Sequence, residues 1–446
     1  MFGVTKWALA LTAALSAVQH AVARPTELHP GTAKDLIINF KDTINGTAGA
    51  IQHASNDGNG TGPPLKITVT NNIGNNVNCY ITGSESSDSS TLTPMILQAD
   101  GTWYYPDGAG STTPQPITAN IAIPLNPKGQ TTDITIPGYI KSARVWFAVG
   151  NLQFFTNLDA NGAPQVTQPS ETNPSDPSAG VNWGFVEFNY AADSGVYANV
   201  SYVDFVGLPL GLSLTNSTGA VQTALGLPAD AVPKICNDLR NQTSVDGKPW
   251  DQLCQTLNGT VIRVLSPNSM VAENSSFGLS NYFDDYVNQV WEKYSSTSLT
   301  VNTQNTPGNV TCNVSGDTLL CGGDNKNYTK PASADIFGCA SGPLNVEPAT
   351  DNAVRKAVVP RLCAAFNRGT YLLDGGDVQP SLGAQSYYTT KVANWYSEIV
   401  HKYEVDGKGY AFSYDDINPD NNENASGEVS SKNPSVLAIT VGGPST

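Results

Sequence analysis

Short segments in which apolar and polar residues alternate constrain the fold most strongly, and they occur in both the first and the last part of the chain. Residues 65–70 alternate apolar and polar side chains with a period of two, and similar segments follow up to residue 214 between Gly, Pro and Asn clusters. Such spacing predicts the short strands of an antiparallel barrel or sandwich. The pattern returns in residues 410–414 and 436–441. A β domain must therefore be completed by strands that lie far apart in the sequence.

Helical patterns fill the interval between these β segments. Apolar residues recur at helical spacing in four segments, residues 218–225, 281–294, 351–368 and 388–403. This order predicts a mainly β fold with an inserted mixed α/β domain. We place the β domain at residues 65–207 plus 408–446 and the mixed α/β domain at residues 208–407.

The N-terminus has the layout of a cleaved secretory signal. Lys6 precedes an apolar run, and Ala-Val-Ala at residues 21–23 supplies the small residues of a cleavage site. We therefore expect residues 1–23 to be a signal peptide and residues 24–64 to be an extension and linker. The mature protein is expected to be extracellular or cell-wall associated. Many Asn-X-Ser/Thr sequons agree with export, and Asn199, inside a strand-like segment, is the least suited to glycosylation.

The net charge and the histidine content limit the partners and the catalytic groups that this chain can use. The chain has 38 acidic and 23 basic residues and a formal charge of −15, which repels phosphate backbones and argues against nucleic acid as a partner. Only His29, His53 and His401 follow the predicted leader. We therefore expect no metal site and no cofactor, and we expect carboxylates to carry out any acid–base chemistry. Beyond the leader, no apolar run approaches the roughly 20 residues of a membrane span, so no membrane association is expected.

Seven cysteines in an exported chain are expected to be oxidised where geometry allows. Their spacing favours three local pairs, although sequence alone leaves the connectivity open. Cys79 is left over in a strand-like segment, as expected of a buried and inert thiol. The predicted disulfides are Cys236–Cys254, Cys312–Cys321 and Cys339–Cys363.

Two carboxylates fall on one predicted hairpin. Glu187 and Asp204 lie in segments rich in aromatic and β-branched residues, joined by the turn signal Asp193-Ser194-Gly195. A turn centred on Ser194 and Gly195 places Tyr202 opposite Glu187, with Asp204 diagonally beyond it at about 7–8 Å. A separation of about 6.5–9.5 Å suits an inverting glycosidase, which needs room for a water molecule. A shift in the strand register removes this arrangement. The alternative interpretation is that both acids are solvated surface residues without a catalytic role.

Other side chains compete for a functional role. Asn189 shares the strand face of Glu187 and is predicted to bond a sugar hydroxyl, with a solvent-facing residue as the alternative. Asp284-Asp285 begins a predicted helix, where acids favour the helix dipole. Asp415-Asp416 follows a predicted strand and is compatible with a loop or a metal site, without the spacing of a calcium loop. The aromatic residues 103–105 suit either sugar stacking or packing.

Several strings occur in order along the chain, over about residues 65–443. They include Arg144-Val-Trp-Phe-Ala-Val-Gly, Tyr202-Val-Asp-Phe-Val-Gly, Tyr282-Phe-Asp-Asp-Tyr-Val and Tyr410-Ala-Phe-Ser-Tyr-Asp-Asp. In this combination the chain resembles glycoside hydrolase family 64, the β-1,3-glucanases with a thaumatin-like β domain.

The resemblance implies inverting endo-hydrolysis of β-1,3-glucan in a wide groove between a thaumatin-like β domain and the α/β domain. The general acid of the family matches Glu187 and its general base matches Asp204, the pair that the hairpin also predicts. The motif positions place Asn189 and Tyr202 at the groove floor, with Arg263 within reach from the α/β domain. The implied partner is β-1,3-glucan, and we expect a monomer. The alternatives are a non-catalytic glucan-binding protein and a thaumatin-like wall or defence protein.

Overall fold

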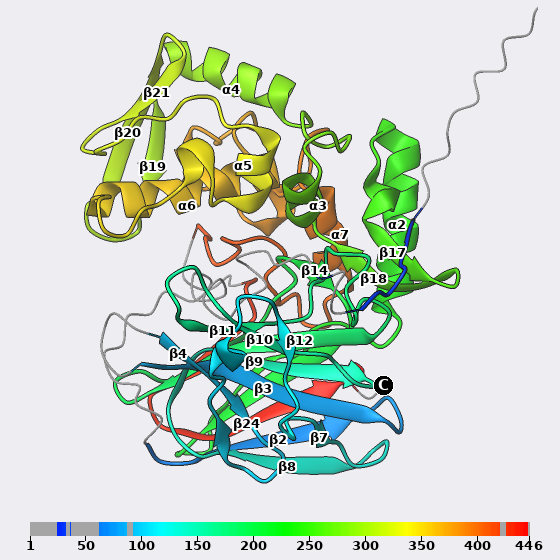
Figure 1. The fold of residues 1–446 in the computed structure, drawn as a ribbon. Coiled ribbons are helices and arrows are strands. Elements are labelled where there is room, and N and C mark those ends of the chain that lie inside the picture. Colours follow the sequence, from blue (N-terminus) through cyan, green and yellow to red (C-terminus); the bar gives the residue numbers. More distant parts are fainter. Residues whose placement is uncertain (1–24, 33–35, 37–61, 87–91, 420–424, 445–446) are drawn as a thin grey trace, which may run out of the picture.

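The computed structural model describes residues 25–32, 36, 62–86, 92–419 and 425–444. The predicted signal peptide and most of the predicted extension lie outside the described residues. The described chain folds into a layered β unit with a second, partly helical unit stacked on it (Figure 1).

Two open sheets form the β unit. The larger has eight strands in the order β23-β13-β12-β9-β3-β4-β5, with β7 pairing to β3, and the smaller has five in the order β16-β15-β24-β2-β8. The described strands therefore form a sandwich and not a closed barrel. The C-terminal strand β24 pairs in parallel with the first strand of the unit, β2, as the returning β pattern requires.

The strands of the larger sheet are β3 (Val77–Ser86), β4 (Leu92–Leu97), β5 (Trp103–Tyr104), β7 (Ile123–Pro124), β9 (Ile140–Val149), β12 (Asn182–Ala191), β13 (Gly195–Val200) and β23 (Glu428–Ser431). Those of the smaller sheet are β2 (Leu65–Asn71), β8 (Thr131–Ile136), β15 (Leu210–Asn216), β16 (Val221–Ala224) and β24 (Pro434–Val441). A three-stranded sheet beside them comprises β6 (Gln115–Pro116), β10 (Phe155–Leu158) and β11 (Pro164–Thr167).

Alternation along its strands gives the larger sheet two different faces. Val145 and Val186 belong to the core between the two sheets, together with Leu437 of the smaller sheet. The neighbouring residues Trp146 and Phe185 point the other way and belong to a separate aromatic cluster. We call this second side the aromatic face.

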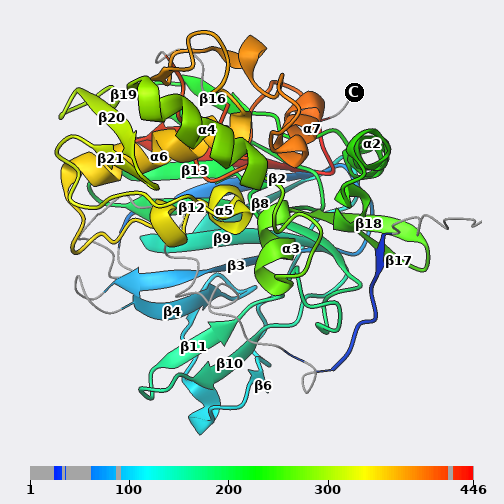
Figure 2. The same ribbon diagram turned by 90° about the horizontal axis from the view of Figure 1, so that it is seen from above.

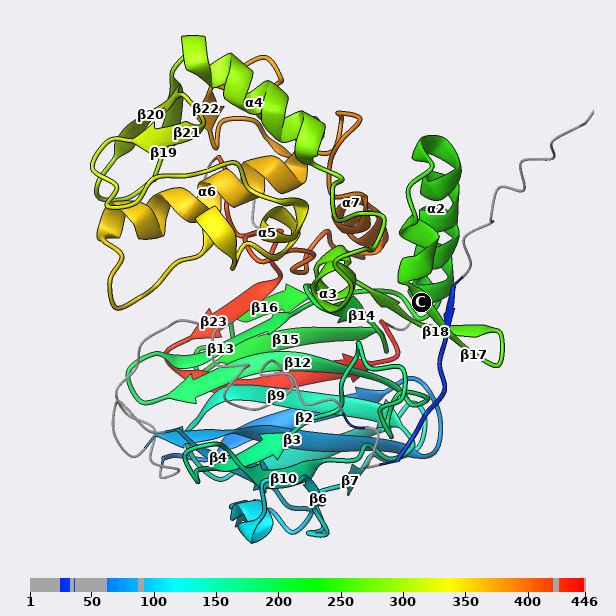
Figure 3. The same ribbon diagram turned by 45° about the horizontal axis from the view of Figure 1, so that its top comes forward.

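The second unit lies over the sandwich (Figures 2 and 3). Its helices are α2 (Ala231–Asp246), α3 (Pro267–Glu273), α4 (Asp284–Ser296), α5 (Ser333–Gly338), α6 (Ala353–Arg368) and α7 (Trp395–Tyr403). One small sheet joins β1 (Thr26–Glu27), β17 (Cys254–Leu257), β18 (Thr260–Leu265) and β14 (Phe205–Val206). Another joins β21 (Thr318–Cys321), β20 (Asn309–Ser315), β19 (Leu299–Asn302) and β22 (Val378–Gln379). Among the described residues, no helix has both the length and the apolar content needed to cross a bilayer.

The helix predicted at residues 218–225 is instead strand β16. The Asn216 side chain accepts hydrogen bonds from backbone amides two and four residues further on, which closes a hairpin between β15 and β16. The smaller sheet thus continues to Ala224. Strand pairing therefore extends the β unit past residue 207, where we had predicted its first segment to end.

The strand predicted at residues 410–414 forms only an isolated bridge between Tyr410 and Ser201. The Asp415 carboxylate accepts hydrogen bonds from two backbone amides of this segment and so diverts them from a strand ladder. The helix predicted from residue 388 begins later, at Trp395, where the Asn394 side chain caps its first turn.

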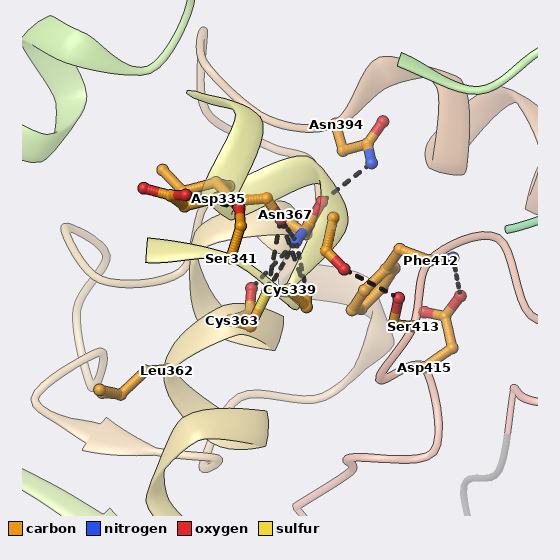
Figure 4. The surroundings of a disulfide bond; sticks show 12 residues. Asp335, Cys339, Ser341, Leu362, Cys363, Asn367, Asn394, Phe412, Ser413 and Asp415 are labelled. Carbon is orange, nitrogen blue, oxygen red and sulfur yellow. Dashed lines mark hydrogen bonds between the residues drawn. A yellow bond between two sulfur atoms is a disulfide. The ribbon is translucent and has the colours of Figure 1, made fainter. Parts of the chain in front are cut away.

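The three predicted disulfides are all present, and Cys79 is free and buried. Burial raises the pKa of the Cys79 thiol, which fits an inert core residue. Cys339–Cys363 ties the C-terminus of α5 to α6 (Figure 4). Beside it, the Asn367 amide donates to the carbonyl oxygens of Ile336 at 2.7 Å and Cys363 at 3.1 Å.

Candidate active site

A row of polar residues crosses the larger sheet on its aromatic face. Glu187 on β12 pairs with Arg144 on β9 on one side and with Asn199 on β13 on the other. Thr82 on β3 extends the row beyond Arg144, and Glu428 on β23 extends it beyond Asn199. Because directly opposed residues point to the same face of a sheet, these five side chains share one surface.

The predicted hairpin between β12 and β13 exists, but its predicted register is wrong. Ala191 pairs with Gly195, so the connection is a three-residue loop and not a turn centred on Ser194 and Gly195. Gly195 adopts a positive φ of 71°, and a Cβ there would lie 2.1 Å from a backbone oxygen of the next strand. Asn199 therefore faces Glu187 in place of Tyr202. Asp204 is not on β13 at all, because that strand ends at Val200.

Asp204 reaches the site from the turn that leads into β14. Its carbonyl oxygen accepts hydrogen bonds from the backbone amide of Ser266 at 2.9 Å and from Ser269 Oγ at 3.1 Å, both at the start of α3. The next residue, Phe205, pairs with β18 and packs edge-on against Trp183 in the aromatic cluster. Asp204 is thus fixed by the second unit and by the aromatic face together.

Arg144 connects the two carboxylates. Its Nη2 lies 3.1 Å from Glu187 Oε1 and 3.7 Å from Asp204 Oδ2, and its Nε lies 3.3 Å from the same Glu187 oxygen. Because one nitrogen makes both contacts, these two carboxylate oxygens can be at most about 6.8 Å apart. The Arg144 and Glu187 side chains are 11% and 8% exposed, whereas that of Asp204 is 32% exposed. The Phe185 ring lies 3.9 Å from the guanidinium carbon.

Arg144 is a functional residue that the sequence did not predict. The residue stands in one of the strings that carry the family resemblance, but its role depends on the pairing of β9 with β12. Local turn signals do not determine that pairing, because the two strands are separated by β10 and β11.

The other predicted site residues divide between the surface and the core. Asn189 lies on the face of Glu187 as predicted, where its Oδ1 accepts a hydrogen bond from the Ser142 amide at 2.6 Å. Tyr202 is a core residue, 4% exposed, and its ring lies against Gly409. Tyr202 is therefore not part of an open groove floor, a correction that follows from the altered register.

Arg263 also differs from its predicted role. It is fully buried on β18, where it stacks on the Trp183 and Phe205 rings and donates to the carbonyl oxygens of Ala179 and Val181. Burial lowers the pKa of its guanidinium to about 10. A side chain without exposed surface does not contact a substrate. Arg263 instead packs beneath the site against Phe205, the residue that follows Asp204.

With this geometry in place, the family becomes clear from comparison with known proteins. Residues 63–441 match the model of glycoside hydrolase family 64, described as beta-1,3-glucanase. The chain belongs to this family.

Two curated relatives of this family 64 chain are glucan endo-1,3-beta-glucosidases, from Cellulosimicrobium cellulans and from Arthrobacter sp. (strain YCWD3). Each is 25% identical over 284 residues, which is 62% of this chain and 48% of the relative. The chain thus spans about half the length of the curated relatives that it matches.

Two solved structures show a similar fold. One is a laminaripentaose-producing beta-1,3-glucanase in complex with laminaritetraose, at a TM-score of 0.72 and 29% identity, covering 85% of this chain and 98% of that one. The other is a beta-1,3-glucanase domain of the same family from Clostridium beijerinckii, at a TM-score of 0.66 and 21% identity, with the same coverage.

The competing acidic pairs have structural roles in this family 64 chain. Asp284 and Asp285 lie in the first turn of α4, where they favour the helix dipole. Asp415 contacts Arg368 at 3.4 Å and His401 at 3.2 Å, and His401 contacts Glu404 at 2.8 Å. Within the described ranges, no group of three or more His, Cys, Asp and Glu residues is placed to hold a metal ion.

His401 joins α7 to the segment that follows Tyr410. Burial disfavours its charged form, but the Glu404 and Asp415 carboxylates outweigh burial and raise the pKa of His401 well above its usual range. A raised pKa in the folded state stabilises the fold below the unfolded-state pKa of about 6.5, and this stabilisation is lost as the pH rises through the folded-state value.

We therefore predict that His401→Gln lowers the free energy of unfolding by about 3–5 kcal/mol near pH 6, because it leaves the buried Glu404 carboxylate without its cation and removes one of the two cations that contact Asp415. The difference from the unsubstituted protein should shrink as the pH rises. Urea unfolding at about pH 6 and about pH 9 measures both values. A difference that does not change with pH would show that His401 does not act through its charge.

Proposed function

We propose that this family 64 protein is a secreted endo-β-1,3-glucanase that hydrolyses β-1,3-glucan with inversion. The observation that carries the proposal is the meeting of Glu187 and Asp204, from different elements, at the guanidinium of Arg144. The laminaritetraose bound by a structural relative supports a β-1,3-glucan as the ligand. The predicted leader, the sequons and the three disulfides support export.

The different exposure of the two carboxyls suggests their roles. Glu187, largely withdrawn from water, acts as the general acid and gives its proton to the oxygen of the leaving sugar. Asp204, which is more exposed, acts as the general base and takes a proton from the attacking water. The water oxygen bonds to the anomeric carbon on the face opposite the breaking carbon–oxygen bond, so the configuration inverts. The inverting assignment follows the family resemblance, and the maximum of about 6.8 Å between the two oxygens held by Arg144 admits only the lower end of the range of about 6.5–9.5 Å for inverting enzymes.

Arg144 fits this reaction because it contacts both carboxyls. Before the chemical step Asp204 carries the negative charge, and afterwards Glu187 carries it. The sum of the two charges stays the same, because Glu187 loses one proton to the leaving oxygen as Asp204 gains another from the attacking water. A cation in contact with both groups therefore offsets one negative charge at every stage, and its planar fork fixes their orientation.

A glucan-binding protein without catalysis is the alternative function, and substitution separates the two. Glu187→Gln and Asp204→Asn should each lower kcat on laminarin at least about 100-fold, because general acid and general base groups contribute roughly 10²–10⁴-fold each. Asp133→Asn is the matched control, since it removes an exposed carboxylate from the other sheet. Reducing-sugar release with product sizing gives the rates, and circular dichroism checks the fold. Near-normal turnover by either site variant would refute its assignment.

Arg144 allows a further test of the proposed chemistry. Arg144→Gln should lower kcat more than Arg144→Lys, since lysine keeps the charge but loses the fork. Initial rates of laminarin hydrolysis give kcat and KM for both variants, and circular dichroism checks their fold. An equal loss of kcat in the two variants would mean that the planar fork is not required.

A further inference from the structure

A segment outside the residues that match the family model connects the two units. We call residues 26–31 the strap, whereas the family match begins at residue 63. The strap starts as β1, which pairs in parallel with β17, and then runs down to the β unit (Figure 3, dark blue). The small sheet has the order β1-β17-β18-β14, so β1 and β14 are its two outer strands. Because β14 follows Asp204 directly, the strap belongs to the sheet that holds the proposed general base.

The first half of the strap is attached to the second unit. The Leu28 amide donates to the Thr256 carbonyl oxygen at 2.8 Å, and the Leu28 side chain is 2% exposed. The Glu27 carboxylate accepts hydrogen bonds from Thr256 Oγ1 at 2.5 Å and from the Asn258 amide at 2.6 Å. Hydrogen bonds to an ionised group are roughly twice as strong as those between neutral groups. These contacts hold the strap at the edge of the small sheet.

The second half of the strap is attached to the β unit. The His29 amide donates to the Pro174 carbonyl oxygen at 3.1 Å, and the Gly31 amide donates to that of Ser175 at 3.0 Å. Both acceptors lie in residues 168–181, which we call the bridging loop. This loop connects β11 to β12, the strand that carries the proposed general acid. The strap therefore binds the small sheet and the entry to β12 at the same time.

The bridging loop also contacts the second unit directly. Arg263 on β18 donates to the carbonyl oxygens of Ala179 and Val181, and Thr172 Oγ1 donates to Glu273 at the end of α3. The loop, β18 and α3 therefore meet at one junction, and the strap closes the outer side of this junction. The position of the small sheet on the β unit is set there.

We propose that the strap is a clamp that fixes Asp204 relative to Glu187, with Leu28 as its main positioning residue. This inference rests on the proposed glucanase function. Arg144 and Glu187 lie in the larger sheet, whereas Asp204 is held by the small sheet and α3. The distance between the two carboxyls therefore depends on how the small sheet sits on the β unit. The strap fixes that position by binding the small sheet with one half and the bridging loop with the other.

Leu28→Ser tests the clamp, and Leu320→Ser is the matched control. The first removes the buried side chain that anchors the strap, whereas Leu320 is 41% exposed on β21 of the same unit. On laminarin, Leu28→Ser should lower kcat at least about tenfold, since a displacement of about 1 Å costs up to roughly 100-fold in rate. KM should change much less, because the strap does not contact the sugar. Leu320→Ser should leave both constants unchanged.

The contact between the strap and the bridging loop supplies a second variant. A Cβ on Gly180 would lie 2.7 Å from Cγ of Pro30, so Gly180→Ala pushes the strap away from the loop. Gly180→Ala should therefore repeat the loss of kcat. Adding Pro30→Gly removes the opposing ring and should restore part of the lost rate, which a general loss of stability would not allow.

Hydrogen exchange tests the clamp without any reaction. The Ser266 amide donates to the Asp204 carbonyl oxygen at 2.9 Å, so its protection reports whether Asp204 is held in place. Leu28→Ser should make this amide exchange at least about tenfold faster through local opening, whereas Leu320→Ser should not.

The outcomes separate the clamp from the proposed function. Unchanged kcat together with unchanged exchange at Ser266 in Leu28→Ser would overturn the clamp. A lower unfolding midpoint with kcat unaltered at the assay temperature would also overturn it, because the strap would then add only stability. Failure of the proposed function gives a different result. The unsubstituted protein would not hydrolyse laminarin, while Leu28→Ser would still accelerate exchange at Ser266.

Discussion

The contact of one guanidinium with two carboxylates is the interaction on which the rest of the site depends. Arg144 and Glu187 come from neighbouring strands of the larger sheet, whereas Asp204 comes from the turn that enters the second unit. A largely buried ion pair is favourable only when its geometry is well supported. Much of the surrounding structure can be understood as that support.

The support comes from two directions. Below the site, Arg144 packs on the Phe185 and Trp146 rings, which keep its guanidinium in place. Beside it, β14 continues directly from Asp204 and pairs with β18, and residues at the start of α3 donate hydrogen bonds to the Asp204 carbonyl oxygen. Arg263, which we had predicted to bind substrate, stacks on Phe205 one residue after Asp204. It therefore acts on the site through the position of Asp204.

The sequence predicted those features that depend on local signals. The mainly β architecture with an inserted mixed unit, the three short-range disulfides and the Glu187 hairpin all follow from nearby residues. The errors have equally definite causes. The predicted two-residue turn is a three-residue loop between Ala191 and Gly195, so Asn199 lies opposite Glu187. Tyr202, which we had predicted to lie there, is a core residue. Asn216 turned an apparent helix into a hairpin. The pairing of Arg144 with Glu187 is a long-range contact that no local pattern encodes.

The anomeric configuration of the first product tests the central claim most directly. Proton nuclear magnetic resonance during the first minutes of β-1,3-glucan hydrolysis distinguishes the two anomers before they equilibrate. A water molecule activated by Asp204 and a leaving group protonated by Glu187 require the α-anomer to appear first. An initial β-anomer would mean that one carboxylate attacks the sugar directly, and the roles assigned to this pair would be contradicted.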